Sequence, residues 1–463
     1  MEKLTDVLTK FQTHLSFTNF RRFFYLVTPS ETTFENVEDV PDYVNISQYW
    51  FFVFVLADIL IAWTTKKSKY ALNDTITSMN AGVFSQLPKF YGKMIAIPFC
   101  LYLYNNYRFF DVDIHSPWIW IAAFLVQDLA YYLAHRAIHE AGVFWSFHQM
   151  HHSSEYYNLS TALRQGFIQE LGTSVIECGQ SFFIPPPLFL AHKRLNTLYQ
   201  FWIHNEFIPK LGPLEYFLNT PSHHRVHHGR NPYCIDKNYA GVLIIWDRIF
   251  GTFESEREEE KPVYGLVENV KSFNQMWIQL FEFKALGYDK GQMKDENGKE
   301  LFPGFIGKLK ACFGPPGYFP GVKTKQFFWW RCMVDSTEGI PPIEEKVKVH
   351  NPPLTLSETL YTTFIFLTGL SSANELMMED HSMSYSLYGA YICYILMAIQ
   401  IVGYYLDKDE RAVDFDIIRL LIICFYCLQT GNVQLCGISA LSMAFAVIFI
   451  KGPKSSRKEI KTS

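Results

Sequence analysis

Three short histidine-rich boxes dominate the chemistry that this sequence could perform. They read HRAIH at 135–139, HQMHH at 148–152 and HRVHH at 224–228, and together they hold eight of the fifteen histidines. On a helix, residues three and four apart share a face, so each box would point its imidazoles into one volume. Eight imidazoles crowded together without a cation would combine desolvation with mutual repulsion. The spacing therefore predicts a metal site.

The number of nitrogens indicates more than one ion. Eight neutral imidazoles exceed what one four- to six-coordinate ion can use, which favours two ions sharing the cluster. The boxes contain neither a Cys-x-x-Cys pair nor an HExxH sequence, which argues against structural zinc and against a zinc peptidase. Iron, zinc, copper and nickel all accept imidazole, so the spacing alone leaves the metal open.

The elements that position these boxes belong to a membrane protein. Aromatic residues make up 17% of the chain and charged residues only 19%, while the mean hydropathy is +0.01. Strongly apolar segments averaged against charged ones give such a value, so we predict an all-α polytopic membrane protein, a helical transmembrane bundle. The net charge of −4 and the lack of a basic stripe argue against nucleic-acid binding.

The apolar runs predict how the chain crosses the membrane. Three runs, at about 46–63, 90–110 and 117–133, precede the first box, and four more lie between 356 and 450. The run 167–190 contains Glu170, Glu177 and three consecutive prolines, so we predict a helical hairpin that enters and leaves on one side. Lys66, Lys67 and Lys69 follow the first run, and the positive-inside rule then places the boxes on the cytosolic side.

The same patterns divide the chain into six segments. A helix at 197–207 is predicted to lead toward the third box, and the hydrophilic stretch after the boxes is predicted to form a small cytosolic cap. The predicted segments are an N-terminal polar segment at 1–44, membrane helices at 45–134, a catalytic core with the membrane hairpin at 135–252, the cap at 253–353, C-terminal membrane helices at 354–450 and a basic cytosolic tail at 451–463.

Neutral nitrogen ligands at the membrane rim suit the oxidation of lipids. Such ligands leave the ions strongly electrophilic, as is needed to activate dioxygen for attack on an unactivated C–H bond. An apolar substrate would enter laterally from the bilayer, and a water-soluble reductant would enter from the cytosol. These conditions favour iron and an oxygenase.

Further motifs resemble a known family. Together with DKNYAG at 236–241 and WDRIFGT at 246–252, the three boxes resemble the fatty acid hydroxylase superfamily, whose members are membrane-bound nonhaem diiron oxygenases of the endoplasmic reticulum. The segments NTPSH at 219–223 and GRNPYCID at 229–236, with the additional C-terminal spans, are most similar to its alkylglycerol (glyceryl-ether) monooxygenases. This resemblance implies two iron ions, tetrahydrobiopterin, and hydroxylation of the ether-linked carbon of alkylglycerols or lyso-alkylglycerophospholipids, which releases a fatty aldehyde and the glycerol portion.

The boxes and the resemblance together give a predicted ligand set. The resemblance adds His204, between the second and third boxes, to the eight box histidines, whereas His223 faces about 100° away from the ligands of its box and is expected to support them. The predicted metal ligands are His135, His139, His148, His151, His152, His204, His224, His227 and His228.

Two carboxylates near the first box are candidate catalytic residues. Asp128 lies seven residues before His135 on the same helix face, where it could orient a ligand or end a polar track; the alternative is a polar contact between helices. Glu140 follows His139 and could orient a ligand or relay protons; the alternative is a solvated charge at a helix end. Asn238 and Asp247 are expected to support the site structurally.

Two other functions fit parts of the pattern. Another lipid oxidation, such as sterol or sphingoid hydroxylation or desaturation fed by cytochrome b5, would use the same metal site. A membrane metal transporter would also gather histidines, although transporters place their ligands at mid-membrane on broken helices. The boxes are instead predicted at a helix end, which favours the enzyme.

Overall fold

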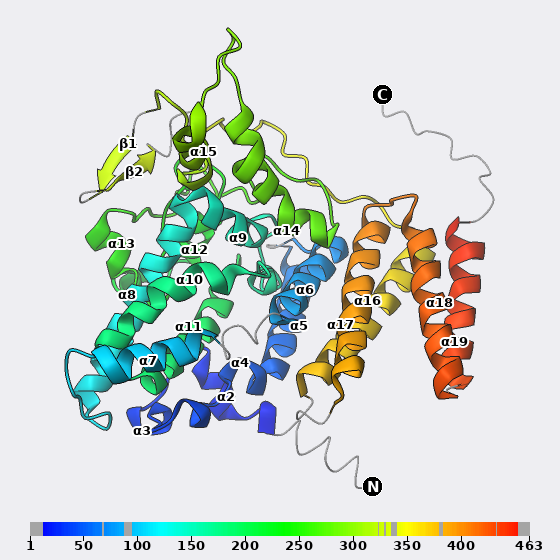
Figure 1. The fold of residues 1–463 in the computed structure, drawn as a ribbon, viewed down its shortest axis with the longest axis horizontal. Helices are drawn as coiled ribbons and strands as arrows, with labels where there is room; N and C mark the ends of the chain where they lie inside the picture. The colour runs from blue at the N-terminus through cyan, green and yellow to red at the C-terminus, as the bar shows by residue number, and fades with distance from the viewer. Residues whose placement is uncertain are drawn as a thin grey trace. The chain divides into compact units, whose positions relative to one another are not determined.

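The structure is a computed structural model that describes residues 13–66, 69–87, 95–322, 324–327, 330–334, 340–378, 383–431 and 433–451. The chain forms two compact units: residues 1–270 with 279–349, and residues 271–278 with 350–463 (Figure 1). Nearly every element is a helix, which confirms the predicted all-α class. Among the described residues, the exception is one antiparallel pair in the predicted cap, β1 (Thr324–Phe327) with β2 (Trp330–Val334).

Short helices and two longer ones form the N-terminal part of the first unit. They are α2 (Phe17–Arg22), α3 (Pro29–Thr32), α4 (Tyr43–Ile46), α5 (Gln48–Thr65), α6 (Leu72–Gln86) and α7 (Ile97–Tyr107). Phe23, Tyr43 and Val55 of this part share a buried core with Leu195 and Phe201 further along the chain. The predicted second span at 90–110 lies partly outside the described residues, and its described portion contains the eleven-residue α7.

The long helix α8 (Pro117–Glu140), drawn in cyan in Figure 1, carries the first box. Pro117 fits the first helical position, where no backbone N–H is needed, and Ala141 leaves the helix in an extended conformation. The next helix, α9 (Gly142–His152), follows at once and carries the second box. Since α8 packs against α9, α10 and α11, the first and second boxes are brought together by one helix pair.

The predicted hairpin at 167–190 is built from α10 (Gln169–Cys178) and the beginning of α11 (Pro186–Trp202), with the break at Pro185. The prediction of a helix over 197–207 was wrong in its end. α11 ends at Trp202 because the Asn205 side chain accepts the backbone N–H groups of Phe207 and Ile208 and so forms a turn. His204 therefore lies just beyond a helix end. The third box lies on α12 (Pro221–His227), and α13 (Ile245–Phe250) follows it.

The remaining helices lie in the predicted cap and the C-terminal unit. They are α14 (Gln275–Lys284), α15 (Gly304–Phe313), α16 (Leu356–Met378), α17 (Tyr385–Leu406), α18 (Ala412–Thr430) and α19 (Val433–Phe445). The predicted basic tail at 451–463 lies outside the described residues except for Lys451. The compact units divide the predicted cap, because residues 271–278 group with the C-terminal helices.

Four helical stretches among the described residues are long and apolar enough to cross a membrane. They are Val37–Thr65, Pro117–Glu140, Tyr385–Leu406 and Val433–Ile450. The predicted runs at 46–63 and 117–133 fall in these stretches, as do two of the four runs predicted between 356 and 450. The helical bundle of a polytopic membrane protein is thus confirmed, and α8 is both a candidate span and the carrier of the first box.

Candidate metal centre

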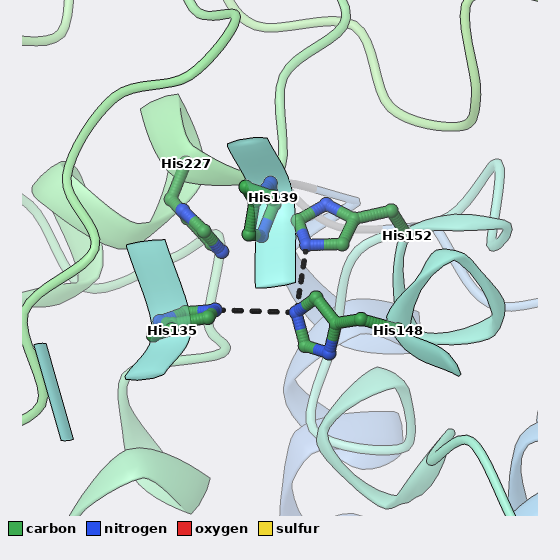
Figure 2. A group of neighbouring side chains, drawn as sticks. All are labelled: His135, His139, His148, His152 and His227. Atoms are coloured by element: carbon green, nitrogen blue, oxygen red, sulfur yellow. Dashed lines mark hydrogen bonds between the residues drawn. The ribbon is translucent and has the colours of Figure 1, made fainter. Parts of the chain in front are cut away.

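The structure gathers the nine predicted ligand histidines into two adjoining groups. The ligand atoms within each group all lie within 4.8 Å of one another, and every one of these side chains is buried. Figure 2 shows the rings of the larger group turned toward one another. They come from α8, α9 and α12. We call them the five-histidine group, His135, His139, His148, His152 and His227, and the four-histidine group, His151, His204, His224 and His228.

The groups do not follow the boxes. In the second box, His148 and His152 join the five-histidine group whereas His151 joins the other. The third box has the reverse arrangement, because His224 and His228 join the four-histidine group and His227 joins the five-histidine group. In each of these two boxes the pair four residues apart lies on one helix face and serves one group, and the third histidine serves the other.

The ring nitrogens converge within each group. In the five-histidine group, Nε2 of His148 lies 3.1 Å from Nε2 of His135 and 3.3 Å from Nε2 of His152. In the four-histidine group, Nε2 of His204 lies 3.2 Å from that of His151 and 3.0 Å from that of His224. The two groups adjoin, because the rings of His152 and His228 stack with centroids 4.4 Å apart.

Five of the rings are oriented by hydrogen bonds that their Nδ1 atoms make, on the other side of the ring from Nε2. Nδ1 of His148 lies 3.0 Å from the side-chain oxygen of Gln169. An Nδ1–H that donates to a fixed oxygen sets the tautomer and leaves Nε2 with its lone pair free for a metal. The other four partners are main-chain carbonyls: Tyr239 for His135 (2.8 Å), Arg164 for His151 (3.0 Å), Gln200 for His204 (2.7 Å) and Lys237 for His227 (2.9 Å).

The electrostatics of the two groups fit metal ligands. Burial lowers the pKa of His148 to about 4 and the pKa values of His204 and His227 to about 3, so these rings are neutral near pH 7. Several buried ring nitrogens have no hydrogen-bond partner among the residues that the structure describes, including Nε2 of His139, His227 and His228. A buried polar atom without a partner is costly, and a metal ion would satisfy these nitrogens at once. The donor set therefore fits transition-metal ions that accept imidazole.

A loop after the third box orients the five-histidine group. It supplies the carbonyls of Lys237 and Tyr239, and Asn238 between them has a φ of 55°, a left-handed conformation that asparagine tolerates. The buried carboxylate of Asp247 accepts the backbone N–H groups of Tyr239 (2.8 Å) and Ala240 (2.9 Å). Asn238 donates to the carbonyl of His223 at 3.0 Å. Both residues thus hold the loop in place, as expected from the sequence.

Asp128 is fully buried beside this loop. Its carboxylate accepts the backbone N–H groups of Val242 (2.8 Å) and Leu243 (2.9 Å), the indole N–H of Trp246 (3.0 Å) and the amide of Asn196 (2.9 Å). These contacts join α8, α11 and the loop. They match the interhelix alternative, and the catalytic role predicted for Asp128 remains a prediction.

Glu140 lies at the edge of the five-histidine group. Its carboxylate accepts a hydrogen bond from Arg136 (2.8 Å) and lies 3.4 Å from the hydroxyl of Tyr239. The Tyr239 ring lies with its centroid 5.3 Å from that of His139. His223, by contrast, belongs to neither group among the described residues, and its Nε2 lies 3.9 Å from Glu215.

One supporting side chain, Gln169 on α10, was missed in the sequence. The indole of Trp145 on α9 also lies beside the five-histidine group, with its centroid 5.1 Å from that of His139. Four of the five oxygen partners of the rings are main-chain carbonyls, which every residue has. No residue type could have indicated them.

Comparison with known proteins places all nine histidines in one matched segment. The fatty acid hydroxylase family model matches residues 120–252. The chain is 44% identical over 413 residues to the alkylglycerol monooxygenase of Caenorhabditis elegans, covering 89% of this chain and 82% of that protein. It is 40% identical to that of Xenopus tropicalis (88% and 86% covered) and 38% identical to that of Homo sapiens (93% and 92% covered). No solved structure matches the chain.

Proposed function

Because the chain belongs to the alkylglycerol monooxygenase family, we propose that it oxidises ether lipids in a membrane, using dioxygen and tetrahydrobiopterin. One oxygen atom enters the C–H bond beside the ether oxygen of an alkylglycerol or a lyso-alkylglycerophospholipid, and the other is reduced to water by the pterin. The resulting hemiacetal separates into a fatty aldehyde and the glycerol portion. The observation that carries this proposal is the similarity to these relatives over most of both chains. The family-model match at 120–252 contains all nine histidines.

Each histidine group is proposed to hold one iron ion. The five-histidine group offers five nitrogens and the four-histidine group four, which fits two ions with positions left for other ligands. When bound, the iron supplies the activation of dioxygen. The chain's own contribution is to fix the imidazoles and to exclude bulk water, since every ligand side chain is buried.

Glu140 is the proposed catalytic carboxylate. It is the last residue of α8 and directly follows His139, and its Oε1 accepts a hydrogen bond from Arg136 and lies 3.4 Å from the Tyr239 hydroxyl. A carboxylate so held can accept or return a proton during the reaction at the neighbouring group. Asp128 is proposed to act through its hold on the segment 242–246, which positions the loop against α8.

The proposed setting is the endoplasmic reticulum membrane, with the centre facing the cytosol. Lys66 and Lys69 flank the first candidate span, and the positive-inside rule places their side in the cytosol. The adjoining groups support a single side for all three boxes. From that side, reduced pterin and dioxygen reach the centre, while the ether lipid enters from the surrounding membrane lipid. The six-segment division of the chain is retained as part of this proposal.

The test compares lipid turnover with and without pterin. Membranes containing the protein are incubated with an alkylglycerol and oxygen, and fatty aldehyde is measured with tetrahydrobiopterin, without it, and with reduced cytochrome b5 in its place. Pterin-dependent aldehyde is expected. Aldehyde formed equally without pterin, or oxidation of a sterol or sphingoid base with cytochrome b5, would overturn the proposal. Metal flux into proteoliposomes without lipid turnover would favour a transporter.

A further inference from the structure

A buried ion pair joins α6 to the turn that follows the second box. Nη1 of Arg164 lies 2.7 Å from Oδ1 of Asp74, and their side chains are only 2% and 4% exposed. Breaking one partner of such a pair leaves an uncompensated buried charge, which makes the pair a strong constraint on where both residues lie. Asp74 lies outside the matched hydroxylase segment, which begins at residue 120.

The pair also holds the end of α9, which carries the second box. The other carboxylate oxygen of Asp74 accepts a hydrogen bond from the hydroxyl of Ser154 at 2.7 Å. Nε of Arg164 donates to the hydroxyl of Ser153 at 3.0 Å. These serines directly follow His151 and His152 in the chain. One carboxylate in α6 therefore fixes both the helix end and the turn at Arg164.

The turn at Arg164 contacts a predicted ligand directly. The carbonyl oxygen of Arg164 lies 3.0 Å from Nδ1 of His151, so it sets the orientation in which His151 presents Nε2 to the four-histidine group. The turn is also pressed against α9, because a Cβ added at Gly166 would lie only 1.8 Å from the carbonyl oxygen of Phe147. A glycine there permits the close approach.

A second carboxylate from the N-terminal helices supports the same group. Asp58 of α5 is 1% exposed, and its Oδ2 accepts the backbone N–H of Leu159 at 3.0 Å. Its Oδ1 lies 3.4 Å from the amide nitrogen of Asn205, the residue after His204. Two buried carboxylates from α5 and α6 thus reach the two turns that carry or orient His151 and His204.

We infer that Asp74 and Arg164 are positioning residues for the metal ion of the four-histidine group, through the Arg164 carbonyl and His151. The inference rests on the proposed function only in assuming that this group binds iron. It extends the metal centre to α6, outside the matched segment. The five-histidine group is instead oriented by Gln169 and the 237–239 carbonyls, so loss of the pair should affect one ion selectively.

The experiment measures iron in the full-length protein with Asp74→Asn, which keeps the shape of the side chain but removes its charge. Iron-57 is loaded anaerobically, and iron per chain and the Mössbauer spectrum are recorded beside those of the wild type. Loss of such a partner typically weakens metal binding about 10- to 100-fold. We expect the affinity of one iron to fall by that factor, with one spectral component lost and the other unchanged. Asp74→Glu, which retains a carboxylate, is expected to restore part of that component.

A matched control breaks a comparable ion pair away from the histidines. Asp416 and Arg419, 2.7 Å apart and 0% and 4% exposed, lie in α18 of the other unit, so Asp416→Asn should leave both components intact. If Asp74→Asn does not fold, Arg164→Lys, which keeps both charges, is used for the same comparison. Equal loss of both components, or a spectrum like that of the wild type, would overturn the inference alone. Wild-type protein that binds no iron would overturn the proposed function and this inference together.

Discussion

The two histidine groups are alike in chemistry and different in support. Each is buried, and in each the ring nitrogens converge within 4.8 Å. In the five-histidine group, His135 and His227 are oriented by the carbonyls of Lys237 and Tyr239, in the loop after the third box. In the four-histidine group, His151 is oriented by the turn at Arg164, which Asp74 of α6 holds from the N-terminal part of the chain. Adjoining ions would thus depend on separate parts of the chain, and the two can be perturbed one at a time.

The largest loss of turnover is expected from removing predicted ligands. The variants are chosen to test whether their effects follow the two groups or the three boxes. His148→Ala and His227→Ala come from different boxes but one group, and His151→Ala and His224→Ala come from the other. Each should lower aldehyde formation by more than about 100-fold, because losing a ligand exceeds the loss of a ligand's partner. In iron-57 spectra, the first two should lose one component and the last two the other.

Spectra that sort by box would break the comparison, since His148→Ala would then match His151→Ala. Wild-type turnover in two of these variants from different groups would remove the shared centre altogether. His115→Ala is the matched control, because His115 is an exposed histidine that pairs with Glu35, and its turnover should equal that of the wild type.

A smaller effect is expected from Asp247→Asn, which loosens the loop. An amide can accept at only one of its two ends, so one of the backbone N–H groups of Tyr239 and Ala240 would lose its buried acceptor. The loop carbonyls that orient His135 and His227 would shift, and we expect turnover to fall about 10- to 100-fold. The spectral component of the five-histidine group should change. A change confined to the other component would contradict the assignment of supports, and Asp295→Asn, in an exposed turn, serves as the control.

The sequence could predict that the histidines meet but not how they divide. Spacings of three and four placed the imidazoles of each box on one side of a helix, and the structure places all nine predicted ligands in the two groups. Pairs four residues apart, such as His148 with His152, do stay together. Which group takes His151 or His227 depends on how α9 and α12 are rotated about their axes. That rotation is set by tertiary packing, which a local pattern does not contain.

The supports were harder to predict than the ligands. Asp74 lies far upstream of the first box, and its partner Arg164 acts through a main-chain carbonyl that carries no residue-type signal. The end of α11 at Trp202 was also missed, because Asn205 ends the helix by accepting backbone N–H groups from the following turn. Asp247 and Asn238 were recognised as supports because they lie in a family-like segment.

A modest effect is expected from Gln169→Leu, which removes the only side-chain partner among the five described oxygen contacts to the rings. Nδ1 of His148 would lose its acceptor at 3.0 Å while the size of residue 169 changes little. We expect metal affinity of the five-histidine group to fall by about tenfold, at the lower end for such partners. Titration with iron under anaerobic conditions measures it, and Gln292→Leu, at an exposed position, is the control. Unchanged affinity would show that the other ligands hold His148 without Gln169.

The smallest expected effect is a pH dependence of stability, caused by Glu282, which lies near the five-histidine group. Burial raises the pKa of Glu282 to about 7, and the hydrogen bond with Trp145, whose ring lies 5.1 Å from that of His139, only partly offsets it. The folded chain thus favours the neutral carboxyl, so its contribution to the free energy of unfolding is present below the ordinary pKa near 4.5 and is lost as pH rises through 7. The melting temperature of Glu282→Gln, which stays neutral, minus that of the wild type should therefore increase as pH rises from 5 to 8. Buried histidines titrate equally in both proteins and cancel from the difference. A difference that stays constant across this range would show that Glu282 is ionised throughout. Glu259→Gln, which changes an exposed side chain, is the control for Glu282→Gln.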